Sequence, residues 1–276
     1  MATPWDTDEP PVYPPITAAG WLRIVLRALA LVVLVFGGLA LLLLIRLIER
    51  PLHGVQRPWT PHLVQFVCRG ALRILGIGRR VSGTPMTERG AVVANHASWL
   101  DIFCLNAQKR AYFVSKSEVA GWPGIGWLAR ATGTVFIERN PARAREQTEV
   151  FQARLLAGHK LLFFPEGTST DGMQVLRFKT TLFQSFFAPE LRDRISVQPV
   201  SVFYAAPPEA ERRFYGWWGD MGFGPHLLAT LAPARQGRVE IIYHPPLKVS
   251  DFPDRKALAM ACEDQVRAGH AGLMRN

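Results

Sequence analysis

The feature that most constrains this chain is an uncharged apolar run near its N-terminus. Residues 28–45 are Ala, Leu, Val, Phe, Gly and Ile only. As an α-helix, a run of this length rises roughly 27 Å, about the thickness of the hydrocarbon layer. No polar stripe interrupts it, which disfavours a soluble core helix. A cleaved signal peptide fits poorly, because the leader at residues 1–22 is acidic and proline-rich. We therefore expect residues 23–50 to form a transmembrane or re-entrant anchor.

The charges on either side of this run predict its orientation. Residues 1–22 contain three acidic residues and neither Lys nor Arg, whereas residues 46–89 contain eight arginines. By the positive-inside rule, everything after the run lies on the cytoplasmic side of the inner membrane. Arg23 and Arg27 weaken this contrast. We expect the arginines that bracket the run to snorkel to the two interfaces.

Composition limits the remaining architecture. At 276 residues and 49% hydrophobic, the chain can bury one substantial core, which we place at residues 83–276. The net charge of +10 favours anionic lipid or phosphorylated substrates. The chain has no zinc-ligand spacing or RNA-binding signature, so we expect neither a metal site nor a nucleic-acid partner. Its three scattered cysteines argue against a disulfide framework and favour a reducing compartment.

A second helix is predicted within residues 51–82, which we interpret as an amphipathic linker. Thr60 is the expected cap, and Pro61 lies in the first turn. Leu, Val, Phe and Ile side chains between residues 63 and 75 form a broad apolar face, opposed by Arg69 and Arg73. The helix either packs on the domain or lies on anionic headgroups at the membrane interface.

Strand and helix patterns alternate from residue 91 onwards. One helix is expected to begin at Asn140-Pro141 and to end at Gly158. The alternation predicts an α/β fold with a mixed, mostly parallel sheet flanked by helices. Ligands of such sheets bind at the carboxyl ends of the strands. The expected strands are Ala91–Ala94, Ala111–Val114, Thr134–Ile137, Leu161–Phe164, Ser196–Phe203 and Val239–Tyr243.

The string Asn95-His96-Ala97-Ser98-Trp99-Leu100-Asp101 directly follows the first of these strands. His96 is suited to collect a proton near neutral pH, and Asp101 can fix its tautomer and stabilise the imidazolium. The two residues are five positions apart, so a turn or a helix start must lie between them. No protein nucleophile is evident nearby. The base is therefore expected to act on a hydroxyl that the substrate brings.

Three further strings follow strands in the same order along the chain. They are Gly133-Thr134-Val135-Phe136-Ile137-Glu138-Arg139, Phe163-Phe164-Pro165-Glu166-Gly167-Thr168-Ser169 and Val197-Gln198-Pro199-Val200. Together with the His96 string, they resemble the four sequence blocks of the glycerolipid acyltransferases, and specifically the bacterial 1-acylglycerol-3-phosphate acyltransferase family. The resemblance covers about residues 85 to 205.

This resemblance implies roles for particular residues. His96 and Asp101 would form the catalytic dyad, and Gly133, Phe136 and Arg139 would shape the acyl-acceptor site. The Arg139 guanidinium offers a fork for phosphate or carboxylate.

A second group of residues would also bind substrate. The Glu166 carboxylate would contact the glycerol or amino-acid part of the acceptor, beside Gly167 and Thr168. Lys116 and Lys179 stand where the family often has basic residues, and each is either a substrate contact or a solvated charge. Thr180-Thr181 follows Lys179 where many members have a small residue, which departs from the family pattern.

The implied reaction is transfer of a fatty acyl group from an acyl carrier protein or coenzyme A thioester to the hydroxyl of a lysolipid in the membrane. No cofactor is expected beyond this co-substrate. Residues 212–221 interleave arginines with aromatics, which favours an interfacial or acyl-pocket contact. Trp218-Gly219-Asp220 with Pro225-His226-Leu227 resembles the lyso-ornithine lipid branch of the family. Both lysophosphatidate and lyso-ornithine lipid are therefore possible acceptors.

Two other classes of function stay open. A lipid or thioester hydrolase would use the same His96–Asp101 chemistry, with Ser98 as the residue that is acylated, although the chain has no Gly-x-Ser-x-Gly elbow. A membrane-anchored lipid-binding protein would make His96, Asp101 and Glu166 incidental.

Overall fold

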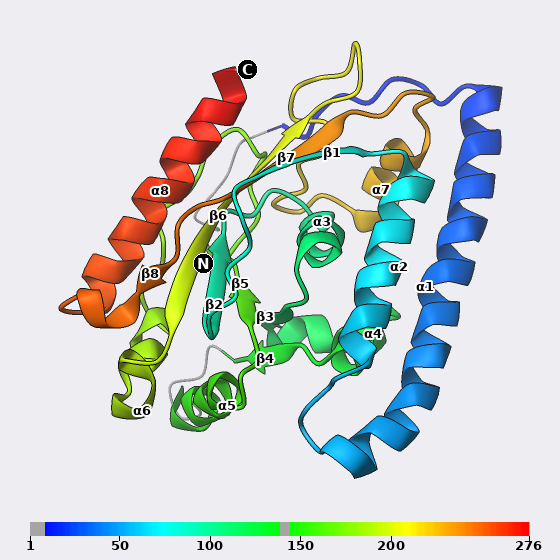
Figure 1. The fold of residues 1–276 in the computed structure, drawn as a ribbon. Coiled ribbons are helices and arrows are strands. Elements are labelled where there is room, and N and C mark those ends of the chain that lie inside the picture. The colour runs from blue at the N-terminus through cyan, green and yellow to red at the C-terminus, as the bar shows by residue number, and fades with distance from the viewer. Residues whose placement is uncertain (1–8, 139–143, 276) are drawn as a thin grey trace.

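A computed structural model describes residues 9–138 and 144–275 of the chain (Figure 1). Arg139 and the predicted helix start at Asn140-Pro141 lie outside these residues. The helices are α1 (Ala18–His53), α2 (Thr60–Leu75), α3 (Asp101–Gln108), α4 (Ile125–Thr132), α5 (Ala144–Leu156), α6 (Pro189–Arg192), α7 (Phe223–Leu231) and α8 (Arg255–Arg275). Short 3-10 helices lie at η1 (Ser117–Gly121), η3 (Leu182–Phe187) and η4 (Val249–Asp251). The strands are β1 (Gly78–Ser82), β2 (Gly90–Ala94), β3 (Tyr112–Lys116), β4 (Val135–Ile137), β5 (Leu161–Phe163), β6 (Ser196–Ala205), β7 (Arg238–Tyr243) and β8 (Leu247–Lys248).

These strands form one mixed sheet in the order β1-β7-β6-β2-β5-β3-β4, with β8 paired to β6. Neighbouring strands are parallel except where β6 pairs with β7 and with β8. Helices cover both faces: α2 and α3 lie on one side of the sheet and α8 on the other (Figure 1). This confirms the predicted mixed, mostly parallel α/β sheet flanked by helices. It also separates the apolar core into two layers, one against each face.

The six predicted strands are confirmed to within two residues at each end. Strand β1 was not predicted, because all five of its residues are exposed and its sequence contains Arg79-Arg80. Pairing with β7 holds this edge strand in place, and side-chain burial does not contribute. Helix α5 ends at Leu156, shortly before Gly158, whose positive φ lies in the left-handed region.

Among the described residues, α1 is the one helix long and apolar enough to cross a membrane by length and composition. It spans 36 residues, and its most apolar window has a mean hydropathy of 3.0 with 6% of residues buried. The helix is longer than the predicted anchor at residues 23–50. It begins after Thr17, whose hydroxyl accepts a hydrogen bond from the Gly20 amide, and it ends at Gly54. The protein therefore carries an apolar N-terminal helix suited to anchoring.

Arg23 and Arg27 attach α1 to α7 and the turn after it, a contact that the sequence did not indicate. Arg23 Nε donates to the Ala232 carbonyl at 2.8 Å. Arg27 Nη1 donates to the carbonyls of Leu231 and Pro233 at 2.7 and 2.8 Å. These carbonyls lie at the C-terminus of α7, where backbone acceptors lack partners within the helix and attract cations. Tertiary contact therefore gives these two partly buried charges backbone partners at the end of α7.

Helix α2 begins where predicted, but its cap comes from α1. Glu49 Oε1 accepts from the backbone amides of Trp59 and Thr60 at 2.7 and 3.0 Å. The Thr60 hydroxyl donates to Glu49 Oε2 at 2.8 Å, so Thr60 does not cap the helix as expected. Of the two placements expected for α2, packing on the domain is confirmed, because its buried residues belong to the apolar core on one face of the sheet. On the predicted polar face, Arg69 Nε donates to the Ala107 carbonyl at the end of α3.

Two glycines set the close approach of α1 and α2, which run side by side in Figure 1. A Cβ atom on Gly38 would lie 2.6 Å from Val67 Cγ2 on α2. In the reverse direction, a Cβ on Gly70 would lie 2.8 Å from Leu34 Cδ2 on α1. Because these distances are shorter than van der Waals contact, the seam needs a residue without a side chain at both places.

This seam predicts opposite effects for two adjacent glycines of α1. Gly37→Ala should keep or raise the melting temperature, because Ala favours the helix by about 1 kcal/mol and nothing lies within 4 Å of the added methyl. Gly38→Ala gains the same propensity but collides with Val67, and overpacking costs about 1–3 kcal/mol. Thermal unfolding of both variants in detergent measures the difference. Equal melting temperatures would mean that the seam tolerates an extra methyl group.

Candidate active site

His96 and Asp101 lie where β2 ends and α3 begins. Strand β2 ends at Ala94, and Asp101 is the first residue of α3, so a helix start separates the two residues as predicted. Asn95 fixes the exit from the strand. Its side-chain amide donates to the Val202 carbonyl of β6 and accepts from the Val202 amide, both at 2.8 Å. The loop that carries His96 is therefore held at the carboxyl end of two neighbouring parallel strands.

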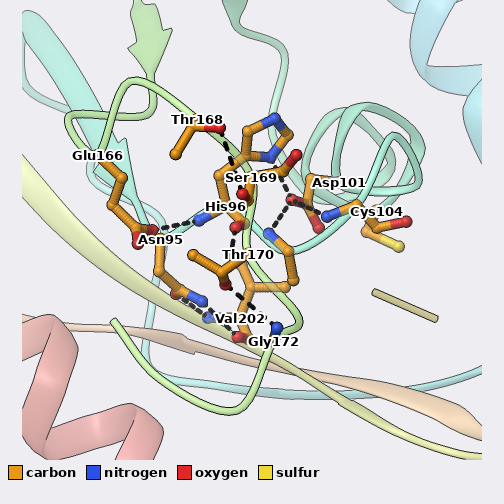
Figure 2. Close-up of polar contacts among 12 residues, drawn as sticks. Asn95, His96, Asp101, Cys104, Glu166, Thr168, Ser169, Thr170, Gly172 and Val202 are labelled. Carbon is orange, nitrogen blue, oxygen red and sulfur yellow. Dashed lines mark hydrogen bonds and ion pairs between the residues drawn. The ribbon is translucent and has the colours of Figure 1, made fainter. Parts of the chain in front are cut away.

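The Asp101 carboxylate is fully buried and collects four hydrogen bonds. Oδ2 lies 2.7 Å from His96 Nδ1 and also accepts from the backbone amides of Ala97 and Ser98 at 2.9 and 3.1 Å (Figure 2). A carboxylate surrounded by donors requires the proton of the neutral imidazole to sit on Nδ1. Nε2 is then the lone-pair nitrogen. Figure 2 shows it on the side of the ring away from Asp101, and 21% of the His96 side chain is exposed.

Two residues that the sequence did not single out complete this arrangement. Tyr204 of β6 donates its hydroxyl to Asp101 Oδ1 at 2.7 Å. Burial and the neighbouring Asp101 charge raise the pKa of Tyr204, so its hydroxyl stays a donor. Phe164 stacks on the His96 ring with centroids 4.0 Å apart and planes 8° from parallel. Tyr204 lies 103 positions after Asp101, and no local pattern links the two.

Glu166 lies beside the dyad but is bonded to backbone and not open to a ligand. Its side chain is buried, Oε1 accepts from the His96 amide at 2.6 Å, and Oε2 accepts from the Leu176 amide at 2.7 Å. The prediction that this carboxylate contacts the acceptor has no support in this geometry. Burial raises the pKa of Glu166 to about 8, against the opposing effect of the two amides and with a contribution from Asp101. The carboxyl group joins the His96 loop to the loop after β5.

The turn after Glu166 brings Lys179 to the site. Gly167 has a φ of +73°, and a Cβ there would lie 2.6 Å from Lys179 Nζ. The lysine side chain therefore lies over the glycine, and the positive φ of Gly167 disfavours any residue with a side chain at this position. Lys179 is also joined to this loop by its backbone amide, which donates to the Pro165 carbonyl at 2.9 Å. The neighbouring Thr168 is partly exposed.

The other predicted site residues are distributed along β3 and β4. Lys116 is exposed at the carboxyl end of β3, where it pairs in register with Ile137. Phe136 is half-buried in β4. Gly133 precedes β4, at the edge of the parallel strands opposite the His96 loop, so the structure does not bring it to the dyad.

Comparisons with known proteins find acyltransferases. Residues 79–203 match the protein-family model described as Acyltransferase. The chain is 58% identical over 265 residues to the lyso-ornithine lipid O-acyltransferase of Rhodobacter capsulatus, covering 96% of each protein. It is 31% identical over 204 residues to the 1-acyl-sn-glycerol-3-phosphate acyltransferase of Neisseria gonorrhoeae, covering 72% of this chain and 77% of that protein.

The chain belongs to the acyltransferase family. A solved structure supports the fold: the 1-acyl-sn-glycerophosphate acyltransferase PlsC of Thermotoga maritima superposes with a TM-score of 0.64. The match covers 93% of this chain and 98% of that one at 22% identity. Both the mixed sheet and its helices are thus shared with an enzyme of the same family.

In this acyltransferase, residues 212–221 pack against the loop that carries His96. The Trp217 amide donates to the Ala97 carbonyl at 2.9 Å. The Trp217 ring contacts Trp122 and Phe223 edge-on, at centroid distances of 6.3 and 6.2 Å. Asp220 is exposed. The aromatic string therefore forms an apolar wall beside the dyad.

Ser98 of the acyltransferase is not arranged as a nucleophile. Its side chain is fully buried, and its hydroxyl has no hydrogen-bond partner among the described residues. The nearby imidazole nitrogen, His96 Nδ1, is bonded to Asp101. The part of the chain that the structure describes also holds no cluster of three or more His, Cys, Asp or Glu able to bind a metal ion.

The raised pKa of Glu166 predicts a pH-dependent stability. A carboxyl group whose pKa rises from 4.5 in the unfolded chain to about 8 in the folded one binds its proton more tightly when folded. The contribution of the protonated Glu166 to the free energy of unfolding is therefore fully present below pH 4.5. It is lost as the pH rises through about 8. Glu166→Gln removes this titration. Between about pH 6 and 9, the wild-type melting temperature should fall relative to that of the variant. Parallel curves would show that Glu166 does not titrate in this range.

Proposed function

We propose that this acyltransferase is membrane-bound and transfers a fatty acyl group from an acyl carrier protein or coenzyme A thioester to the hydroxyl of a lysolipid, with His96 as the general base. The observation that carries the proposal is the hydrogen bond of 2.7 Å between His96 Nδ1 and the buried Asp101 carboxylate. It directs the basic nitrogen Nε2 outward, where a hydroxyl can reach it.

The proposed reaction needs no covalent enzyme intermediate. Nε2 of His96 accepts the proton of the lysolipid hydroxyl as its oxygen attacks the thioester carbonyl carbon. The new C–O bond forms, the C–S bond breaks, and the departing sulfur takes the proton from the imidazolium. Asp101 stabilises the transient positive charge on the ring. The acyl donor is a co-substrate, so this chemistry requires no cofactor.

Several residues are proposed to bind the substrates. Lys179 lies over the Gly167 turn, next to the loop that carries the dyad, where its ammonium can pair with a phosphate or carboxylate. Lys116 and Thr168 are open to solvent at the same edge of the sheet. Phe136 and Arg139 are proposed for the acceptor site on the family resemblance alone. Gly133 is proposed to contribute indirectly, by setting the path of the chain that leads to these two residues.

We propose lyso-ornithine lipid as the principal acceptor and lysophosphatidate as a second one. The high identity to an enzyme named for the ornithine substrate, over nearly the full length of both chains, supports the first. The relative named for the glycerol phosphate substrate supports the second. Both acceptors present an anionic group that basic side chains can bind, together with a hydroxyl to be acylated. The ammonium of the ornithine lipid would pair with exposed Asp220.

We further propose that α1 anchors the enzyme to the inner membrane with the catalytic domain in the cytoplasm. One face of α1 exposes large apolar residues, among them Leu29, Val33 and Leu47. The opposite face contacts α2, α4 and α7. Because the helix is docked along its length, crossing the bilayer upright would carry polar domain surface into hydrocarbon. These contacts favour a re-entrant placement within one leaflet over a spanning one.

Replacing the base tests the mechanism. His96→Ala should lower acyl transfer by about 10² to 10⁴-fold, and Asp101→Asn by a comparable factor. Tyr204→Phe should lose less, because three donors to Asp101 remain. The measurement is the rate of labelled acyl transfer to a lysolipid by folded, membrane-bound protein. Wild-type turnover by His96→Ala would exclude the general-base role. Release of free fatty acid without acceptor would favour the hydrolase.

Acceptor preference is tested with both lysolipids and one labelled acyl donor. We expect products from both, with lyso-ornithine lipid acylated faster. Arg139→Ala should slow both reactions, since each acceptor carries an anionic group. Asp220→Asn should slow acylation of the ornithine lipid more, because only that acceptor carries an ammonium. Activity confined to lysophosphatidate and unchanged in Asp220→Asn would contradict this assignment.

A further inference from the structure

An open cavity of about 730 Å³ lies at the C-terminal end of α1. Five arginines line it: Arg46, Arg50, Arg57, Arg130 and Arg154. They come from α1, the α1–α2 connection, α4 and α5, so the cavity forms only when these elements meet. Among the described residues, its lining contains no carboxylate. We call it the arginine cavity.

The five charges of this cavity are only partly balanced within the described part of the chain. The nearby carboxylate, Glu49, pairs with Arg46 at 3.0 Å but is committed to the start of α2. Burial, together with the charge of Arg46, lowers the pKa of Arg57. Burial lowers that of Arg154, with a further contribution from Arg57. Burial and the charges of both arginines lower the pKa of adjacent His159 to about 4. A bound anion would relieve this repulsion.

Two of the guanidinium groups are held in place before any ligand arrives. Arg57 Nη1 donates to the Ala131 carbonyl at 2.7 Å, and Arg154 Nη2 donates to the Gly133 carbonyl at 3.0 Å. Gly133 also makes room for Arg57, because a Cβ there would lie 2.9 Å from the guanidinium carbon. Guanidinium groups fixed by backbone acceptors lose little freedom when they bind an anion. The small residue before β4 thus serves this cavity.

The arginine cavity is separate from the dyad. Gly133 precedes β4, and His159 precedes β5, so the cavity borders the amino-terminal edge of these strands. His96 follows the carboxyl end of β2, which is parallel to β5. The lining of the cavity joins residues 43–55 to Arg130 of α4 and Arg154 of α5. An anion bound there would not occupy the position of the reacting hydroxyl.

The remaining walls of the cavity are apolar. Leu43, Leu44 and Leu47 of α1 line it, and all three are exposed. They belong to the helix whose apolar surface is suited to the membrane. Cationic groups beside exposed leucines match a molecule with an anionic head and a hydrocarbon chain. An acidic protein or a free phosphate would leave the leucines without a partner.

We propose that the arginine cavity binds the headgroup phosphate of an anionic phospholipid, whose acyl chains lie along the leucines of α1. The bound lipid neutralises the arginines and fixes the depth of α1 in the leaflet. Lipid of the surrounding membrane thereby becomes part of the folded protein at a site distinct from the acceptor site.

The test is lipid titration of the detergent-solubilised full-length protein, with bound lipid counted by native mass spectrometry. The probes are phosphatidylglycerol and phosphatidylcholine with identical acyl chains. Arg50→Gln/Arg130→Gln removes two cavity charges at exposed positions. Arg73→Gln/Arg275→Gln removes the same charge elsewhere on exposed surface and is the matched control. Arg50→Gln alone, at an exposed side chain, serves if the double variant fails to fold.

We expect wild type and control to bind phosphatidylglycerol about tenfold more tightly than phosphatidylcholine, and the cavity variant to lose this preference. Equal affinity of the wild type for both lipids would overturn the proposal, as would an equal loss in the control. Displacement of phosphatidylglycerol by inorganic phosphate at the same concentration would assign the cavity to free anions. Displacement by acyl carrier protein would assign it to the donor. Either result would overturn the lipid assignment.

Discussion

The site depends above all on the buried Asp101 carboxylate. It accepts hydrogen bonds from the imidazole of His96, from two backbone amides of the same loop and from the Tyr204 hydroxyl. A buried carboxylate without donors would be costly, so these four bonds fold the loop around it. The same bonds orient the His96 ring and leave its second nitrogen on the side away from Asp101. The same four hydrogen bonds therefore stabilise the loop and orient the His96 ring.

Around this centre, buried polar side chains join segments that are distant in the sequence. Asn95 ties the His96 loop to β6, and Glu166 ties it to the loop after β5. Each satisfies backbone groups that the sheet leaves unpaired where its strands end. Both carboxylate oxygens of Glu166 therefore accept from backbone amides and join the two loops.

The two N-terminal helices are likewise held by close packing and by polar side chains that reach distant segments. Glycines on α1 and α2 allow their backbones to approach closely, and Glu49 caps α2 from α1. Arg23 and Arg27 attach the other end of α1 to α7. The candidate anchor helix α1 is therefore packed against the rest of the fold. The arginine cavity is a product of this packing, because its charges come from four segments that meet only in the folded protein.

The sequence by itself determined the elements whose signal is local. The apolar period of the strands, the uncharged run of α1 and the His96–Asp101 spacing could all be read within windows of a few residues. It could not reveal Tyr204, the clamp formed by Glu166 or the docking of Arg23 and Arg27, and it did not indicate the exposed edge strand β1. Each of these features depends on contacts between residues that are distant in the sequence, in the case of Arg23 and Ala232 by 209 positions. Hydrogen-bond partners of buried polar groups are chosen by chain topology, which brings together residues that no sequence period connects. Only the tertiary structure decided them.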